Sequence, residues 1–401
     1  MLSLTAEGRR KEVIPLQQKH EIPLLLYLAR TKIDKDVLGN IYQLMDTPID
    51  WDEVLSLSLK HRMAPLLYHH LTSSIVPSKQ PQSIMPKLKE IHNQNFNRNK
   101  HLYDELHKIT TLLHEAEVEA LVLKGPVLAR LIYPSIGVRC MKDIDLVVKE
   151  EHWQRVKECF FSLGYSLPET LPELTSSEMV KYTQYFSQIE FSQKGHIPVE
   201  IHFRLFNMGV PKKEPWLFEH VRTMDGAPIP STEILLLHLC VHANTHNFCS
   251  LMLLCDIGAV VQHYGDEIDA NCIQKIAAAR GITCSVYNSL ILVEELLNIP
   301  IPEGLKKTLK PGNIRQMVFE VAWNKPKILA LQKAEKLPQF EAPTYYLLEM
   351  DNILDKLKYL CRILFPPLRW LAAYFKKKPT PILYPTYLVR YLLGHGRDKK
   401  R

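Results

Sequence analysis

Two aspartates stand one residue apart in the segment RCMKDIDLVV, residues 139–148. Apart from them the segment resembles an apolar strand, in which Asp is disfavoured and costly to bury. Residues two apart in a strand point to the same face, so we expect Asp143 and Asp145 to project together while Ile144 points into the core. Carboxylates held side by side repel one another unless a cation lies between them. The pair therefore predicts a site for Mg²⁺ or Mn²⁺.

A third acidic residue stands in a second alternating segment, PVEIHF at residues 198–203. Its alternation places Glu200 and His202 on one face and the apolar residues on the other. Glu200 is the candidate third carboxylate of a two-metal site. His202 shares its face and either orders metal or substrate, or makes a structural cross-strand hydrogen bond.

A candidate phosphate-binding turn precedes both segments. A short apolar strand, EALV at residues 119–122, ends at Lys124 and Gly125 and continues into the predicted helix PVLARLIYP, with Pro126 at its first position. Free N–H groups at a helix start favour phosphate oxygens, and glycine permits close approach of the backbone. Lys124 suits a phosphate as a compact point charge. Arg139 and Lys142 either steer a triphosphate or compensate the aspartates' charge.

The surrounding elements give a helix-rich organisation. Residues 1–117 show apolar side chains at three- and four-residue spacing, most clearly in one helix from Trp51 to Leu71. Beyond Ala120, short strands alternate with helices, and Lys194 and Gly195 form the turn between the last two strands. We expect four parts, which are a helical subdomain (1–117), an α/β core (118–230), a second helical subdomain (231–330) and a basic, aromatic-rich helical tail (331–401).

Three histidines recur every four residues in LLLHLCVHANTHNF, residues 235–248. His238, His242 and His246 would therefore share one helical face. The spacing permits zinc, but the glutamate of an HExxH motif is absent, so we favour satisfied or nucleotide-lining histidines, with His242 as a nucleotide contact. Asp256 in LLCDIGAVV pairs with one of them or lies on a helix surface.

Charge is unevenly distributed along the 401 residues. The net charge is +7, and residues 353–401 alone hold twelve Lys or Arg against two Asp, which leaves −3 for the rest. Residues 1–352, the body of the chain, thus have no surplus of basic residues, which disfavours a long nucleic acid as partner. The tail's mixture of aromatic and basic residues fits a membrane surface, an acidic partner, a nucleic-acid backbone or a packed terminal helix. No apolar run reaches membrane-spanning length, and we expect a cytoplasmic protein.

The order LKG, short helix, YPSIGVRCMKDIDLVV and VEIHFRL resembles the uncharacterised nucleotidyltransferase family within the DNA-polymerase-β-like superfamily. The resemblance extends from about residue 20 to 300, because the segments with the histidines and with Asp256 resemble the family's helical continuation. It implies an α+β fold, in which a small mixed β-sheet nucleotidyltransferase core is embedded between N-terminal and C-terminal helical regions.

By this resemblance, Asp143, Asp145 and Glu200 are the metal ligands and catalytic residues, and Gly125 is the glycine of the nucleotide-binding turn. Lys124, Arg139, Lys142, His202 and His242 complete the expected nucleotide site. The family's turn is Gly-Ser, whereas Pro126 follows Gly125 here, so no hydroxyl is available to bind a phosphate. The interval of 18 residues from Gly125 to Asp143 also exceeds that of the best-known members.

The implied activity is transfer of an NMP from an NTP to an acceptor hydroxyl or phosphate, with release of pyrophosphate. ATP is the expected donor because of its abundance, and the acceptor is a small molecule, a peptide or a protein side chain. One alternative is a catalytically inactive module of the same fold that acts through a protein partner, which the missing serine supports. Another is peripheral membrane attachment through the basic tail.

Overall fold

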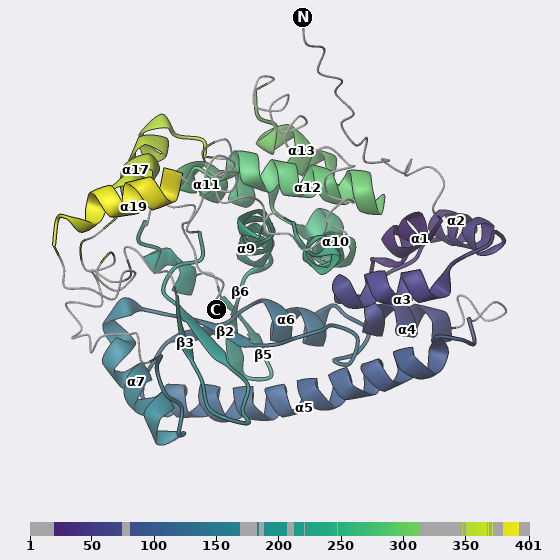
Figure 1. Cartoon of the computed structure of the whole chain (residues 1–401), viewed down its shortest axis with the longest axis horizontal. Helices are drawn as coiled ribbons and strands as arrows, with labels where there is room; N and C mark the ends of the chain where they lie inside the picture. Colours follow the sequence, from purple (N-terminus) through teal and green to yellow (C-terminus); the bar gives the residue numbers. More distant parts are fainter. Residues whose placement is uncertain are drawn as a thin grey trace, which may run out of the picture.

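The computed structural model describes residues 20–73, 81–168, 183, 188–206, 212–219, 221–246, 248–312, 347, 350–366, 368, 371 and 380–392. A small sheet lies in the middle of the molecule, with a long helix below it and a layer of helices above it (Figure 1). The sheet supplies the candidate metal ligands, and the helices on both sides hold the segments that lead into it.

The described residues before the sheet form five helices, and apolar residues shared between the first four and the start of the fifth give this region a core cluster of its own. They are α1 (Glu21–Leu28), α2 (Lys35–Met45), α3 (Trp51–Lys60), α4 (Ala64–Thr72) and α5 (Met85–Glu115). Asp34 and Asp50 cap α2 and α3 by accepting backbone N–H groups. Arg30 is fully buried and donates to the Leu297 carbonyl, which ties this region to the helices of the C-terminal half.

The expectation of one helix from Trp51 to Leu71 is wrong. The chain turns between α3 and α4, where Arg62 has a φ of 60° and the N–H of Met63 donates to the Ser58 carbonyl at 2.6 Å. Met63 is buried, and Pro65 is the second residue of the next helix, where its missing N–H costs nothing. The apolar spacing continues across the break, which is why it resembled one helix.

The central sheet has the strand order β1-β2-β4-β3. Its strands are β1 (Ala120–Val122), β2 (Ile144–Val148), β3 (Gln188–Phe191) and β4 (Val199–His202). β2 and β4 pair in parallel, and the two outer pairs are antiparallel. β2 is buried along its whole length, so it is the central strand in packing as well as in order.

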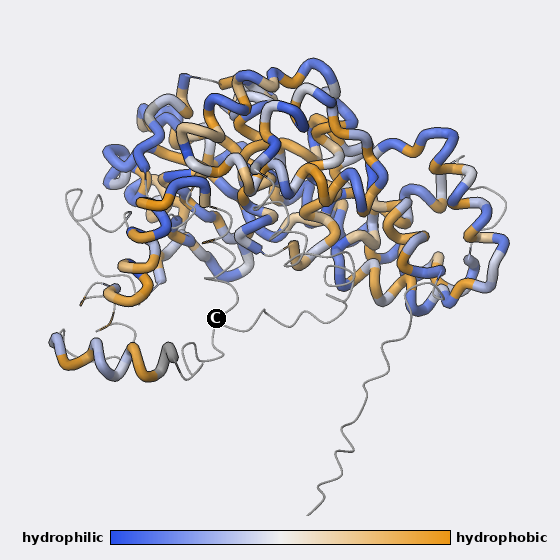
Figure 2. The backbone as a smooth tube through the Cα atoms, turned by 90° about the horizontal axis from the view of Figure 1, so that it is seen from above, coloured by the Kyte–Doolittle hydropathy of each residue, from blue (hydrophilic) through white to orange (hydrophobic). Residues whose placement is uncertain are grey.

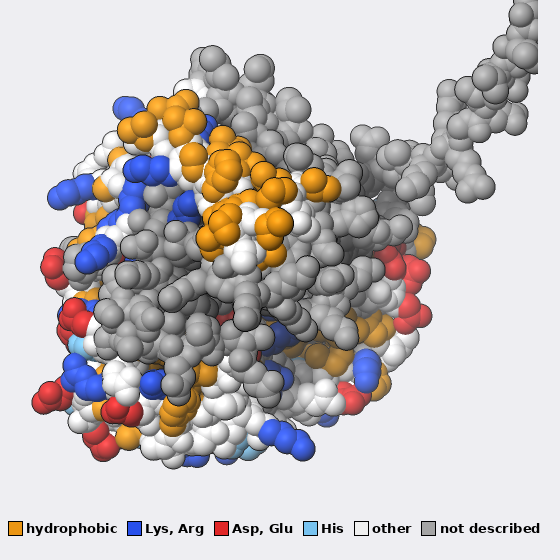
Figure 3. Space-filling model, turned by 60° about the vertical axis from the view of Figure 1, so that its left-hand side comes forward, with side chains coloured by type: hydrophobic (Ala, Val, Ile, Leu, Met, Phe, Trp, Pro, Cys, Tyr) orange, Lys and Arg blue, Asp and Glu red, His pale blue; other side chains and the backbone are white. Residues whose placement is uncertain are grey.

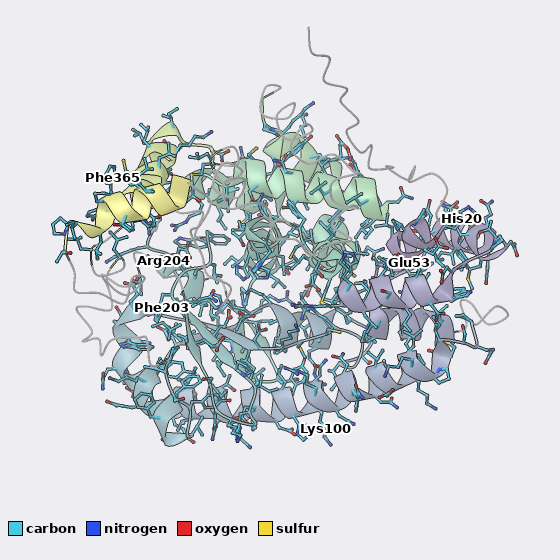
Figure 4. All side chains as sticks on the ribbon, viewed as in Figure 1. His20, Glu53, Lys100, Phe203, Arg204 and Phe365 are labelled. Carbon is cyan, nitrogen blue, oxygen red and sulfur yellow. The ribbon has the colours of Figure 1, made fainter. Side chains whose placement is uncertain are left out.

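Short helices connect and cover this sheet. They are α6 (Lys124–Leu131), η2 (Glu150–His152), α7 (Trp153–Ser162) and η3 (Pro215–Phe218). Phe203 directly follows β4 and contacts Trp153 of α7, with ring centroids 5.9 Å apart. Phe203 and Arg204 lie beside the sheet, whereas Lys100 of α5 points away from the body (Figure 4). The turn at Lys194 and Gly195 is confirmed, with Gly195 at a φ of 85°.

The C-terminal half begins with the hairpin β5 (Val221–Met224) and β6 (Ala227–Pro230). Its helices are α9 (Thr232–Thr245), α10 (Leu251–Tyr264), η4 (Gly265–Glu267), α11 (Ala270–Arg280), α12 (Thr283–Leu297) and α13 (Glu303–Leu309). Buried residues of α9, α10 and α12 share one apolar core with the sheet. The predicted α+β class, with a small mixed sheet between helical regions, is confirmed, and the four domain boundaries stay predictions.

Two helices of the basic tail are described, α17 (Ile353–Leu364) and α19 (Leu383–Leu392). Figure 2 shows hydrophobic segments running through the body, while α17 and α19 lie at its edge. None of the described helices is long and apolar enough to cross a bilayer.

Candidate metal and nucleotide site

The pairing of β2 with β4 brings the predicted carboxylates together. Asp145 is in register with Glu200, and Glu200 is in register with Glu190 on β3. Since paired residues on adjacent strands point to the same face, three acidic side chains lie across three neighbouring strands. Two of them, Asp145 and Glu200, were expected from the sequence to meet.

Asp145 is buried and bound by two side chains. Its Oδ1 lies 3.0 Å from the Lys124 ammonium and accepts a hydrogen bond from His202 Nε2 at 2.8 Å. Although burial alone raises the pKa of Asp145, the charge of Lys124 and the hydrogen bond from His202 hold that pKa well below its usual range. Asp145 is therefore a carboxylate at neutral pH, and Lys124 occupies the position of a counter-cation.

Lys124 reaches this place because of an unusual backbone conformation. It is the first residue of α6 and has a φ of 43°, a left-handed conformation that L-residues rarely adopt. The N–H of Leu123, just before it, donates to the Asp145 carbonyl at 3.0 Å, so the turn is joined to β2. The predicted helix start is thus confirmed, two residues earlier than Pro126.

Asp143 stands directly before β2 and is half-buried. Burial and the neighbouring charge of Asp145 raise its pKa, while the charges of Lys124 and Arg139 oppose the shift. When one carboxylate opposes the ionisation of another, a nearby cation stabilises the ionised form of both. The charge of Asp145 thus makes the Asp143 carboxyl harder to ionise, and a shared face for the two side chains stays a prediction.

Glu200 is partly exposed and meets a polar neighbour that sequence reasoning missed. Gln188 of β3 donates to Glu200 Oε2 at 2.7 Å. Burial, followed by the charge of Asp145, raises the pKa of Glu200 to about 7, and Glu190 contributes in the same direction. The alternation QIEF, with Gln188 and Glu190 on the face opposite to the buried Ile189, was the available signal.

The ligand atoms of Asp145, Glu200 and His202 lie within 4.8 Å of one another, a separation suited to one metal ion. Glu200 Oε2 is 3.6 Å from His202 Nε2. Two carboxylates whose charges conflict, beside an imidazole, fit a divalent cation. Asp143 stands outside this group, so the predicted set of Asp143, Asp145 and Glu200 overlaps it in two residues.

Arg139 has a structural partner that the sequence did not indicate. Its guanidinium binds Asp256 of α10 in a bidentate pair, with Nε to Oδ1 at 2.8 Å and Nη2 to Oδ2 at 2.6 Å, and Tyr133 donates to the same carboxylate. Asp256 is buried, so the expectation that it pairs with a histidine or lies on a helix surface is wrong. Nucleotide contact by Arg139 stays a prediction.

Gly125 lies against this ion pair. A Cβ at position 125 would come within 2.9 Å of Arg139 Nη1 and 3.1 Å of Met141 Sδ. Glycine is therefore required by the packing of residues 139–141 behind the turn. Its contact with a nucleotide stays a prediction.

The histidines of α9 form a row that begins at the sheet. Ring centroids are 6.4 Å apart for His202 and His238, 6.0 Å for His238 and His242, and 4.4 Å for His242 and His246. Burial and the charge of Lys124 lower the pKa of His238 and His242 well below the usual range. These two imidazoles are therefore neutral at pH 7, and His246 is exposed at the outer end.

His238 has no hydrogen bond of ordinary geometry to either ring nitrogen within the described residues, although the Leu205 backbone lies near enough to oppose the lowering of its pKa. Within the described residues, one group of side chains is arranged to hold a metal ion, and it does not include the histidines of α9. Nucleotide contact by His242 stays a prediction.

Lys142 is exposed, and its backbone carbonyl accepts a hydrogen bond from Arg98 Nη2 at 2.9 Å.

The sheet, the helix start at Lys124 and the paired acidic side chains describe a nucleotidyltransferase domain. The family model described as "Uncharacterised nucleotidyltransferase" matches residues 47–298, which is more than half of the chain, and the protein belongs to that family. The matched residues include all of α5, the whole central sheet and α9 to α12. Among curated proteins, no match is found.

Proposed function

We propose that the protein is a metal-dependent nucleotidyltransferase that moves an NMP from an NTP, with ATP as the expected donor, to an acceptor hydroxyl or phosphate. The observation that carries the proposal is the register of Asp145 with Glu200, beside a helix that begins at Lys124. In this arrangement the carboxylates that would bind a metal ion lie on one side of the reaction centre, and the helix start that would bind phosphate groups lies on the other.

In this reaction an acceptor oxygen forms a bond to the α-phosphorus while the bond from the α-phosphorus to the bridging oxygen breaks. The electron pair of the broken bond leaves with pyrophosphate, and the acceptor's proton passes to water. Bound Mg²⁺ or Mn²⁺ would neutralise charge on the phosphate oxygens. Asp145 and Glu200 would hold it together with Asp143, and His202 orients Asp145 through its hydrogen bond.

Lys124 has two roles in this proposal. Without substrate it neutralises Asp145, and with a metal and nucleotide bound its ammonium is available to a phosphate oxygen. This exchange replaces the serine hydroxyl that the turn lacks. The acceptor is proposed to be a small molecule, a peptide or a protein side chain, since the body of the chain has no basic surplus for a long nucleic acid.

The test is pyrophosphate release from each of the four NTPs with Mg²⁺ or Mn²⁺, compared between the wild type and an Asp143→Asn, Asp145→Asn double variant. Asp266→Asn, a change of one exposed aspartate on η4, is the matched control. Release that needs the metal and the two aspartates is expected. Calorimetry on the same samples measures nucleotide binding, and metal-dependent release that persists in the double variant refutes the assignment. Nucleotide binding without release in any condition favours the inactive binding module instead.

A second candidate function is attachment to an anionic membrane surface through α17. The helix faces the body with Asp355, which is buried and 2.8 Å from the Lys212 ammonium. Apolar side chains point outward instead, and their exposed fractions are 71% for Ile353, 60% for Leu354 and 53% for Leu357. Figure 3 shows hydrophobic side chains gathered on the face that carries α17 and α19, with Lys and Arg beside them.

An exposed apolar helix face joined to a basic tail suits the surface of an anionic bilayer. We expect the protein to co-sediment with vesicles that contain phosphatidylserine, and a Leu354→Glu, Leu357→Glu variant to lose that binding. Leu59→Glu, at an exposed leucine of α3, serves as the control. Equal sedimentation of all three proteins removes this candidate.

A further inference from the structure

The break between α3 and α4 places an arginine where helices usually end in glycine. Arg62 is exposed and has a φ of 60°, which is unfavourable for a residue with a Cβ. The turn is fixed in place, because Ser250 Oγ donates to the His61 carbonyl at 3.0 Å and the Leu251 N–H donates to His61 Nδ1 at 3.2 Å. Arg62 is thus held beside the start of α10, next to the outer end of the histidine row.

A second segment brings two more cations to the same region. Asn95 of α5 binds the carbonyls of Gly137 at 2.8 Å and Arg139 at 3.1 Å, so residues 137–142 are laid along the helix. Arg98, one turn further on, donates to the Lys142 carbonyl at 2.9 Å. Both Arg98 and Lys142 are exposed, and Lys142 directly precedes Asp143.

Cys140 lies in this segment, two residues before Lys142. Burial raises the pKa of the Cys140 thiol, and the positive charges of Arg139, Arg62, Lys142 and Arg98 all oppose that shift. Arg62 also stabilises the ionised form of the Asp143 carboxyl. The cluster therefore borders the candidate metal site on the side of Asp143.

Of these four cations, Arg139 is neutralised by Asp256. Within the described residues, Arg62, Arg98 and Lys142 form no ion pair with a carboxylate, in contrast to Lys124 and Lys149. Beside the single carboxyl group of Asp143, three like charges are in excess and repel one another. Such an arrangement is stabilised by a multivalent anion, and two guanidinium groups match phosphate oxygens in geometry as well as in charge.

We propose that Arg62, Arg98 and Lys142 form a polyphosphate-binding site that holds the β- and γ-phosphates of the nucleotide beside Asp143. The proposal rests on the proposed function for the identity of the nucleotide. It adds two residues, Arg62 and Arg98, from the helical region before the sheet, and it assigns to the strained turn at Arg62 the task of holding the departing pyrophosphate.

Calorimetry with inorganic tripolyphosphate and with AMP, each in the presence of Mg²⁺, tests the site without any reaction. Arg62→Ala, Arg98→Ala and Lys142→Ala are each expected to weaken tripolyphosphate binding about tenfold, the effect of losing one charge-assisted hydrogen bond, and the triple variant more than a hundredfold. AMP binding is expected to stay within twofold of wild type. Arg155→Ala is the matched control, because Arg155 is also a surface arginine bonded to backbone carbonyls.

The Arg62→Gly variant distinguishes a loss of tripolyphosphate binding from a loss of stability. Glycine fits a φ of 60° better than arginine does, so the variant is expected to have an unchanged or higher unfolding midpoint together with weaker tripolyphosphate binding. Arg62→Lys, which keeps the charge, is expected to recover part of the binding.

Tripolyphosphate binding that is unchanged in the triple variant overturns the proposal, as does an equal loss of AMP binding. Tripolyphosphate binding that depends on the three cations, in a protein that releases no pyrophosphate, supports this site and favours the inactive binding module over the enzymatic function.

Discussion

The Lys124 ammonium lies 3.0 Å from Asp145 Oδ1, and both side chains are buried. The pair joins the start of α6 to the strand that carries the aspartates. It makes Asp145 both a structural residue and a candidate metal ligand, whereas Asp143, which is half-buried at the strand's start, has only the second role.

The two aspartates should therefore respond differently to the same substitution. Asp143→Asn is expected to lower turnover at least about 100-fold with little change in the free energy of unfolding. Asp145→Asn is expected to lower turnover as well and to destabilise the fold by about 3 kcal/mol, since it leaves Lys124 buried without its counter-charge. Urea titration together with the pyrophosphate assay measures both effects, and equal stabilities of the two variants would contradict this division of roles.

Metal binding should depend on pH through Glu200, whose pKa is raised to about 7. Below that pH the proton competes with the metal, so Mn²⁺ affinity is expected to rise about tenfold per pH unit up to about 7 and to level off above it. Glu200→Gln should remove this dependence. Glu190→Gln should move the midpoint to lower pH, because it removes one of the charges that raise the pKa. Calorimetric titration of Mn²⁺ between pH 5 and 8 measures this.

The stability of the metal-free protein should change in the opposite direction over this range. The folded chain holds the Glu200 proton up to about pH 7, whereas the unfolded chain releases it near 4.5. The contribution of Glu200 to the free energy of unfolding therefore falls as pH rises from 4.5 to 7. A Glu200→Gln variant lacks this contribution, and the difference between its urea midpoints and those of wild type at pH 5 and pH 7 reports it. A difference that is the same at both pH values would argue against the raised pKa.

The main contribution of the Arg139–Asp256 pair should be to the free energy of unfolding, whatever part Arg139 has in catalysis. Asp256→Ala leaves a buried guanidinium without its carboxylate and is expected to cost about 3 to 5 kcal/mol. A combined Arg139→Met, Asp256→Leu variant removes both charges and should recover most of the loss. Thermal unfolding measures these differences, and a double variant as unstable as the single one would show that the pair contributes more than charge compensation.

Gly125→Ala should damage the turn by crowding. The new methyl group would lie 2.9 Å from Arg139 Nη1, in a guanidinium that Asp256 holds in place, so we expect a loss of about 1 to 3 kcal/mol in the free energy of unfolding. Pyrophosphate release should fall as well, because the turn at Lys124 shifts. Wild-type stability and activity in this variant would mean that Arg139 moves freely. Gly39→Ala, where a Cβ meets no atom within 4 Å, is the control.

The sequence by itself determined the local elements and the chemistry that they carry. Period-two alternation placed Asp145, Glu200 and His202 on strands, and the LKG segment marked a strand that ends at a helix, because both patterns depend on neighbours in the chain. The apolar spacing also predicted the helical character of α5 and the α+β class. It did not locate the break at Arg62, since buried positions continue across it.

Only the tertiary structure decided which charges meet. Arg139 pairs with Asp256 across 117 residues, and Lys124 pairs with Asp145 across 21, whereas local spacing suggested a nucleotide for Arg139 and a histidine for Asp256. A buried charge takes the partner that the packing of distant elements brings to it, and no period in the sequence encodes that choice. The same reason applies to Arg62, which reaches the surroundings of Asp143 because its turn is fixed against α10.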